Sequence, residues 1–223
     1  MKRNLDLSGW LFRLIFVLRL RLQVNFFNYF ARFICVVKGV SYGKNVKFNG
    51  YPRLSRSPHS TITIGDNCLF NSSKNSARIG LIRRCAFVTL DSGAEIKIGN
   101  NTGGTGAVLA AFKSITIGNN VLLGAYTTIF DSDIHNPDPA IRDIPDQTAR
   151  PVIIEDNVFL GMNCVVLKGV RIGENSVIGA NSVVMKSIPP NSMAMGNPCK
   201  VLMKRNWGKP NQDKTNQDIK ENL

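Results

Sequence analysis

The chain has 223 residues, a length that fits one domain of ordinary size with short appendages. Its 28 Lys and Arg residues against 15 Asp and Glu residues give a formal net charge of +13, which favours an acidic partner such as nucleic acid, an anionic membrane or a phosphorylated ligand. The five cysteines are scattered without a C-x-x-C pair, which argues against a disulfide framework or a zinc ribbon and favours reduced thiols in the cytoplasm.

The N-terminal region, residues 10–37, is rich in Leu, Phe, Ile and Val but is interrupted by Arg13, Arg19, Arg21 and Arg32. A spanning helix needs about 18 or more apolar residues in a row, and a signal peptide keeps its charges ahead of its apolar stretch, so the region fits neither. We therefore predict a helical segment over residues 1–38, as one helix or two short ones. It either makes peripheral contact with the inner face of the membrane or packs on the protein itself or a neighbouring subunit.

Short repeats begin after this segment and continue to residue 203. In each unit an aliphatic residue is followed by a small residue and two turn-forming residues, and the longest run has an aliphatic side chain at every sixth position: Ile154, Leu160, Val166, Ile172, Ile178 and Val184. Neither a helix nor a single strand has a period of six, whereas a short strand that wraps around a column does. We expect these side chains to point inward, together with the small residue four positions later, as at Cys68, Val121, Cys164 and Ser176.

The repeats break between residues 130 and 151. This segment contains Pro137, Pro139 and Pro145, which exclude a regular helix or a central strand, and it holds His135, one of only two histidines in the chain. A loop of this length without secondary structure of its own is usually functional or disordered. The predicted organisation is therefore a helical segment (1–38), a repeat domain (39–203) with an inserted loop (130–151), and a polar tail (204–223).

The repeats resemble the left-handed parallel β-helix of the hexapeptide-repeat acyltransferases. The string Asp131-Ser-Asp-Ile-His135 resembles the catalytic stretch of the sugar O-acetyltransferase branch, which includes the maltose and galactoside acetyltransferases. Together with residues 151–202, it is most similar to the group that acetylates capsule, colanic-acid or O-antigen sugars. The resemblance implies an all-β, triangular prism, acetyl-CoA as the acyl donor, a sugar acceptor, and a homotrimer with each active site between neighbouring chains.

His135 is the candidate general base. Transfer of an acetyl group to a hydroxyl requires removal of the hydroxyl proton, which a neutral imidazole can accept near neutral pH. Asp133 is the first candidate to orient the imidazole, or alternatively to bind acceptor hydroxyls, and Asp131 is the second candidate. A cysteine nucleophile is disfavoured because Cys68 and Cys164 occupy inward positions, where buried, inert thiols are expected.

The resemblance places the coenzyme A groove along the last coils. The candidate contacts there are Met162, Ala180, Met185, Lys186 and Lys200, with the lysines suited to the phosphates. The glycine-rich stretch 102–108 stands where the galactoside and maltose enzymes have an acceptor pocket, so we expect a different acceptor, with this stretch as a corner or part of the acceptor cleft. A zinc site is disfavoured because it needs about three histidines, and no metal is expected.

The sequence thus predicts a cytoplasmic, acetyl-CoA-dependent sugar O-acetyltransferase of surface polysaccharide biosynthesis that transfers the acetyl group directly. Two alternatives remain open: an N-acetyltransferase acting on an amino sugar or nucleotide sugar, and a β-helix that serves as a non-catalytic scaffold. Nucleic acid is not expected as a partner, because the basic residues lie at the two ends of the chain and no known nucleic-acid-binding module is visible.

Overall fold

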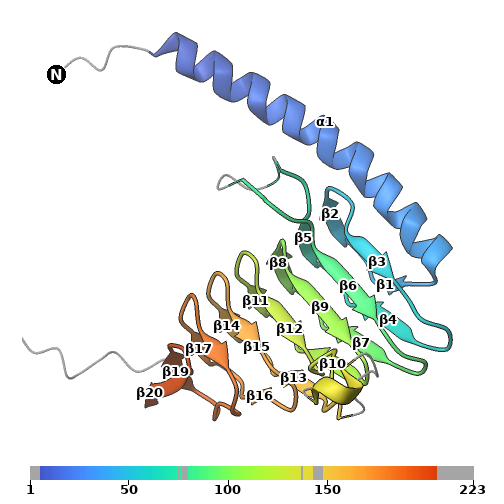
Figure 1. The fold of residues 1–223 in the computed structure, drawn as a ribbon. Coiled ribbons are helices and arrows are strands. Elements are labelled where there is room, and N and C mark those ends of the chain that lie inside the picture. Colours follow the sequence, from blue (N-terminus) through green and yellow to red (C-terminus); the bar gives the residue numbers. More distant parts are fainter. Residues whose placement is uncertain (1–5, 75, 77–79, 137, 143–147, 205–223) are drawn as a thin grey trace, which may run out of the picture.

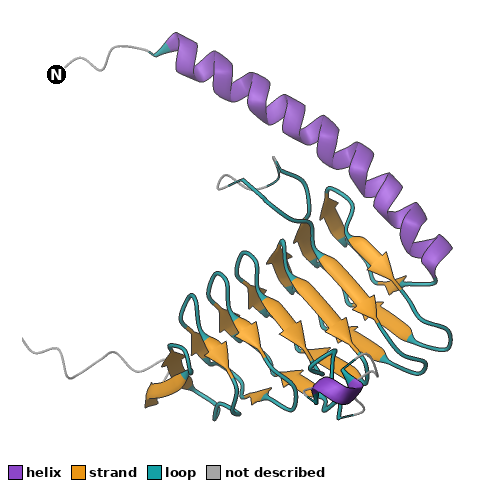
Figure 2. Cartoon of the chain, viewed as in Figure 1, coloured by secondary structure: helices purple, strands orange, loops and turns teal. Residues whose placement is uncertain are grey.

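The computed structural model describes residues 6–74, 76, 80–136, 138–142 and 148–204, with the backbone alone at 19–21 and 23–25. Within these residues one long helix, α1 (Leu7–Lys38), precedes a column of short strands (Figures 1 and 2). The predicted tail lies outside the described residues beyond Lys204.

The strands form three sheets, which the chain visits in turn from β1 to β18, and the last two strands, β19 and β20, both join sheet B. Sheet A contains β1 (Ser41–Tyr42), β4 (Thr61–Ile64), β7 (Glu95–Ile98), β10 (Ser114–Ile117), β13 (Val152–Ile154) and β16 (Arg171–Ile172). Sheet B contains β2 (Lys47–Asn49), β5 (Leu69–Asn71), β8 (Gly103–Thr105), β11 (Leu122–Leu123), β14 (Phe159–Leu160), β17 (Val177–Ile178), β19 (Ser192–Met195) and β20 (Lys200–Lys204). Sheet C contains β3 (Arg53–Ser55), β6 (Ala86–Thr89), β9 (Val108–Ala111), β12 (Thr128–Phe130), β15 (Val165–Val166) and β18 (Val183–Val184). The pairing is parallel throughout, except that β20 folds back antiparallel on β19.

The core is a column of inward-pointing side chains. All six aliphatic residues of the long run, from Ile154 to Val184, are completely buried, and so are the predicted small inward residues at Cys164 and Ser176. In-register pairs such as Ile154 with Ile172 lie one 18-residue coil apart. The predicted inward positions are therefore confirmed. Their side chains fill the interior of the prism, which is a packed core rather than a channel.

The corners between sheets use residues that tolerate left-handed backbone angles. Asparagine occupies many of them with φ near +57°, a conformation that costs asparagine less than other non-glycine residues: Asn45, Asn67, Asn101, Asn120, Asn157, Asn163, Asn175, Asn181 and Asn191. Between sheets A and B their amides form a ladder, with Asn120 Nδ2 donating to Asn157 Oδ1 at 3.0 Å and Asn157 Nδ2 donating to Asn175 Oδ1 at 2.9 Å. Neighbouring corners thus hold one another in register.

The C-terminal part of α1 closes the first coil. Ala31 and Cys35 are completely buried against it, and Asn28 Oδ1 accepts a hydrogen bond from the Phe48 N–H at 2.6 Å. Gly39, with φ of +64°, ends the helix and turns the chain into β1. This part of the predicted helical segment packs on the protein's own body, while Figure 1 shows the rest of α1 extending past the column.

No helix among the described residues has a stretch apolar enough to cross a bilayer.

Candidate active site at the interrupted coil

The inserted loop leaves the prism after β12 and returns before β13, at the corner between sheets C and A. Its base is closed by a hydrogen bond from the Arg150 N–H to the Asp131 carbonyl oxygen at 2.8 Å. The next coil supports it, because the Gly169 N–H donates to the Arg150 carbonyl oxygen at 3.0 Å. Residues 137 and 143–147 of the predicted loop lie outside the described residues.

Asp131 anchors the start of the loop. Its side chain is fully buried, and its two carboxylate oxygens accept hydrogen bonds from the Phe112 N–H at 2.7 Å and the Lys113 N–H at 2.6 Å. Burial raises the pKa of Asp131 above its ordinary value, although the backbone N–H donors act in the opposite direction. These contacts give Asp131, the second candidate to orient His135, a structural role at the base of the loop.

His135 is presented on a tight turn. The His135 N–H donates to the Asp133 carbonyl oxygen at 2.7 Å, and the residue between them, Ile134, has φ of +65°. A β-branched residue at positive φ is strained, at a cost on the order of 1–3 kcal/mol, and such strain concentrates at active sites and ligand clamps. The exposed side chain of His135 therefore stands at the strained turn of the loop.

Lys168 holds the two arms of the loop together. Its ammonium lies 2.6 Å from Asp133 Oδ2 and 2.5 Å from Thr148 Oγ1, so it contacts both the outgoing and the returning arm. The side chain of Lys168 is only 14% exposed, against 47% for Asp133. The Asp133 carboxylate is thus paired with a lysine, and no hydrogen bond between it and the His135 ring is seen among the described residues.

Lys168 is not among the candidate residues predicted from the sequence. A signal was present, because Lys168 follows Arg150 by 18 residues, which is one coil, and so stands directly beside the base of the loop. Lys186 follows by another 18 residues. The 18-residue repeat alone could therefore have indicated a column of basic residues at this corner.

The candidate coenzyme A contacts divide between two edges of sheet C. Met162 and Ala180 lie on adjacent coils at the corner between sheets B and C, where the Asn181 N–H donates to the Met162 carbonyl oxygen at 2.8 Å. Lys200, at the start of β20, follows Cys199, whose backbone N–H donates a hydrogen bond to the Val183 carbonyl oxygen at the start of β18, at this same corner. Met185 and Lys186 instead follow β18 at the corner that carries the loop. At about 3.3 Å per residue, the strand between the corners spans on the order of 15 Å.

The thiols are poorly suited to covalent catalysis. Burial raises the pKa of Cys68, Cys85, Cys164 and Cys199 above the ordinary value, and it raises the pKa of Cys35 to about 11. A thiol with a raised pKa is protonated near neutral pH and is a weak nucleophile. Across the described residues, no group of three His, Cys, Asp or Glu side chains is placed to hold a metal ion.

Parts of the chain are similar in sequence to known acetyltransferases. Residues 151–186 match the family model described as the hexapeptide repeat of succinyl-transferase. The chain is 49% identical over 92 residues to a galactoside O-acetyltransferase of Lactococcus lactis, covering 41% of this chain and 44% of that protein. It is 37% identical over 115 residues to the galactoside O-acetyltransferase of Escherichia coli, covering 51% and 56%. The resemblance to the hexapeptide-repeat sugar O-acetyltransferases is confirmed.

The alignments span only about half the length of these relatives. Among solved structures, AntD, an N-acyltransferase from Bacillus cereus, superimposes with a TM-score of 0.59 over 78% of this chain and 88% of its own, at 19% identity. At that identity the likeness concerns the fold, and the predicted left-handed parallel β-helix is confirmed.

Replacing Asp131 with asparagine tests its role as the anchor of the loop. Asp131→Asn retains one acceptor oxygen but turns an amide NH₂ toward a backbone N–H, so we expect the free energy of unfolding to fall by about 1–3 kcal/mol. Asp138→Asn is the matched control, because Asp138 is exposed and uses one oxygen to accept from the Ala140 N–H, which asparagine can also do. Urea unfolding measures both, and equal stabilities would contradict the anchoring role.

Proposed function

We propose that this protein is an acetyl-CoA-dependent O-acetyltransferase that acts on a sugar hydroxyl in surface polysaccharide biosynthesis. The observation that carries the proposal is the presentation of His135 on a strained turn, in a loop that Lys168 clamps at both arms. The similarity to galactoside O-acetyltransferases supports a sugar hydroxyl as the acceptor.

His135 is the general base of the proposed reaction. It takes the proton of the acceptor hydroxyl as that oxygen attacks the thioester carbonyl, and the thiolate of coenzyme A leaves as the new ester forms and is protonated. Lys168 and Asp133 act as positioning residues, since their ion pair fixes the arm that ends at His135. The raised pKa values of the buried thiols support direct transfer rather than an acyl-cysteine step.

The acyl donor lies between two chains in this proposal. Met185 and Lys186 stand at the His135 corner, whereas Met162, Ala180 and Lys200 stand at the opposite edge of sheet C. A closed, head-to-tail trimer joins the His135 corner of each chain to the Met162 corner of the next, which assembles both sets around one donor. The lysines on both sides supply positive charge for the phosphates of the donor.

The outer face of sheet C supports this arrangement. Its outward positions carry apolar side chains, including Val108, Phe130, Val165 and Val183, whereas those of sheet A carry polar residues such as Thr61, Lys97 and Arg171. Sheet B is also apolar outside, at Leu122 and Phe159, but only sheet C has candidate site residues along both edges. Sheet C is therefore the face that we propose to turn toward the other two chains.

The two histidines of the chain offer a matched test of the base. We expect His135→Asn to lower the rate of acetyl transfer by about 10²–10⁴-fold. His59→Asn is the control, because His59 is exposed and has φ of +58°, which asparagine tolerates well. The assay follows thiol release from acetyl-CoA with nucleotide sugars, free sugars and lipid-linked oligosaccharides as acceptors. Each class of acceptor is tested with members that carry only hydroxyl groups and with members that carry an amino group.

Unchanged transfer by His135→Asn would contradict the assignment of the base. Transfer to amino sugars alone would favour the N-acetyltransferase alternative. A chain that neither binds coenzyme A in calorimetry nor transfers acetyl groups to any acceptor would instead be a scaffold.

We also propose that the free part of α1 rests on the cytoplasmic face of an anionic membrane. Its apolar side chains are strongly exposed, with Trp10 at 65% and Phe12 at 74%, and the Arg13 guanidinium lies 5.6 Å from the Trp10 ring. Monomeric proteins rarely expose a contiguous apolar surface of this kind, and a helix that combines Trp, Phe and Arg suits a membrane interface. The net charge of +13 favours anionic lipids.

Vesicle binding tests the membrane contact. Trp10 and the exposed Leu14 lie one helical turn apart on one face of α1, and each large side chain that leaves the membrane costs about 1.5–3 kcal/mol. Trp10→Ser with Leu14→Ser should therefore weaken binding to phosphatidylglycerol vesicles about 100-fold or more. Phe159→Ser, at an exposed position of sheet B, is the control and should bind as the unaltered chain does. Equal binding by all three proteins in a flotation assay, or equal binding to uncharged vesicles, would contradict the proposal.

A further inference from the structure

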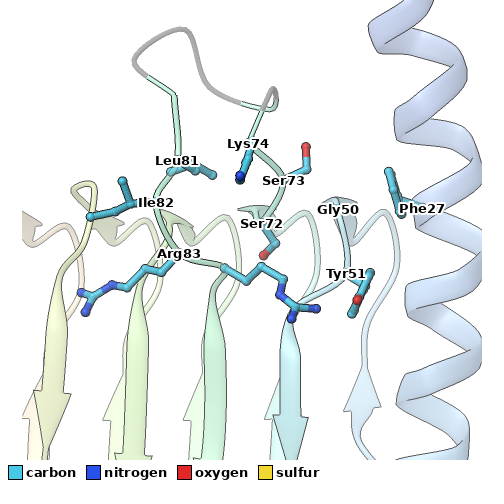
Figure 3. A pocket seen from close by; sticks show the side chains of 10 residues that line it. Phe27, Gly50, Tyr51, Ser72, Ser73, Lys74, Leu81, Ile82 and Arg83 are labelled. Atoms are coloured by element: carbon cyan, nitrogen blue, oxygen red, sulfur yellow. The ribbon is translucent and has the colours of Figure 1, made fainter.

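A cavity of about 300 Å³ lies between α1 and two described stretches of the segment that joins β5 to β6, residues 72–74 and 81–84 (Figure 3). It is at the corner between sheets B and C on the first coils, so it belongs to the opposite edge of sheet C from the His135 loop. Ligand pockets typically span about 300–1,000 Å³, which gives this one room for a group of roughly monosaccharide phosphate size.

One wall of the cavity is rigidly held. The Tyr126 hydroxyl accepts a hydrogen bond from the Ile82 N–H and donates to the Gly80 carbonyl oxygen, both at 3.1 Å. The Arg83 guanidinium donates to the carbonyl oxygens of Gly106 and Tyr126 and to Thr128 Oγ1. Arg83 and Tyr126 therefore fix this wall through contacts with the protein's own backbone and side chains.

Two other basic residues remain available to a ligand. Lys74 lines the cavity, and within the part of the chain that the structure describes it has neither a hydrogen bond nor an ion pair from its side chain. The guanidinium of Arg84 lies 4.5 Å from the Tyr51 ring centre and likewise has no described hydrogen-bond or ion-pair partner. No acidic residue lines the cavity among the described residues, so its charge is uncompensated.

The rest of the lining is largely apolar or aromatic. Phe27 and Tyr51 face one another across the side toward α1, with ring centres 6.3 Å apart, and Ile82 is 86% exposed at the opposite side. The Ser73 side chain adds a hydroxyl beside Lys74. A matching ligand combines an anionic group with a less polar body.

We propose that this cavity binds a phosphate-bearing ligand whose phosphate contacts Lys74 and Arg84. A phosphate monoester carries about −1.5 to −2 charges at neutral pH, which two cations balance better than they balance a single carboxylate. The body of the ligand lies against Phe27, Tyr51 and Ile82. The site does not depend on acetyl transfer, and its phosphate can come from a soluble sugar phosphate or from a lipid.

Calorimetry on the full chain without an acyl donor tests the site and separates the two sources. Glucose 1-phosphate is the soluble probe, dihexanoyl phosphatidic acid below its micelle concentration is the lipid probe, and glucose is the uncharged reference. We expect at least one phosphate probe to bind and Lys74→Met or Arg84→Met to raise its Kd about 10- to 100-fold, the range of a lost charge-assisted hydrogen bond. Lys47→Met and Arg53→Met, exposed positions on the same coils outside the cavity, should leave the Kd unchanged.

A third variant keeps the test decisive if either of the first two fails to fold. Ile82→Glu changes an exposed side chain, so it should fold normally, and its carboxylate should repel the phosphate and also raise the Kd. Binding of glucose 1-phosphate alone supports a soluble ligand, and binding of phosphatidic acid alone supports a lipid. The proposal is overturned if neither phosphate binds, if the cavity variants bind as the unaltered chain does, or if the control variants lose as much affinity as the cavity variants.

Discussion

The in-register stacking of each coil on the one before it is the constraint on which the rest of the structure depends. Parallel backbone hydrogen bonds join the coils, and aliphatic side chains at every sixth position fill the column between them. The place of a residue in the six-residue unit therefore decides whether it points inward and at which edge it stands. Any insertion must leave the prism at a corner, as the His135 loop and the β5–β6 segment both do.

The parts of the fold that obey the period were predictable from the sequence. The run from Ile154 to Val184 sets the strands and the inward side chains, because only one register buries an aliphatic residue at every sixth position. The contacts of the insertions are not periodic. The burial of Asp131 under two backbone N–H groups and the pairing of Asp133 with Lys168 depend on the path of the loop, which propensities do not specify. The cavity beside Arg84 likewise depends on how α1 meets a non-repeating segment.

The two long edges of sheet C carry different sets of candidate site residues. One edge has the His135 loop, Lys168 and Lys186, and the other has the proposed phosphate cavity on the first coils and Met162 with Ala180 on the last. Tyr126 stands between the cavity and Met162 on this second edge, and its hydroxyl fixes the wall of the cavity. A flat strand keeps the two edges apart within one chain. The proposed trimer joins them across the boundary between chains.

Activity of mixed trimers tests this division of the site most directly. His135→Asn removes the base from one edge, and Ala180→Trp blocks the donor corner on the other, so trimers of either variant alone should be inactive. Co-expression in equal amounts should restore about a quarter of the unaltered activity, because in a quarter of the boundaries both intact edges meet by chance. Mixed trimers without restored activity would contradict a site shared between chains and would place the whole site within one chain.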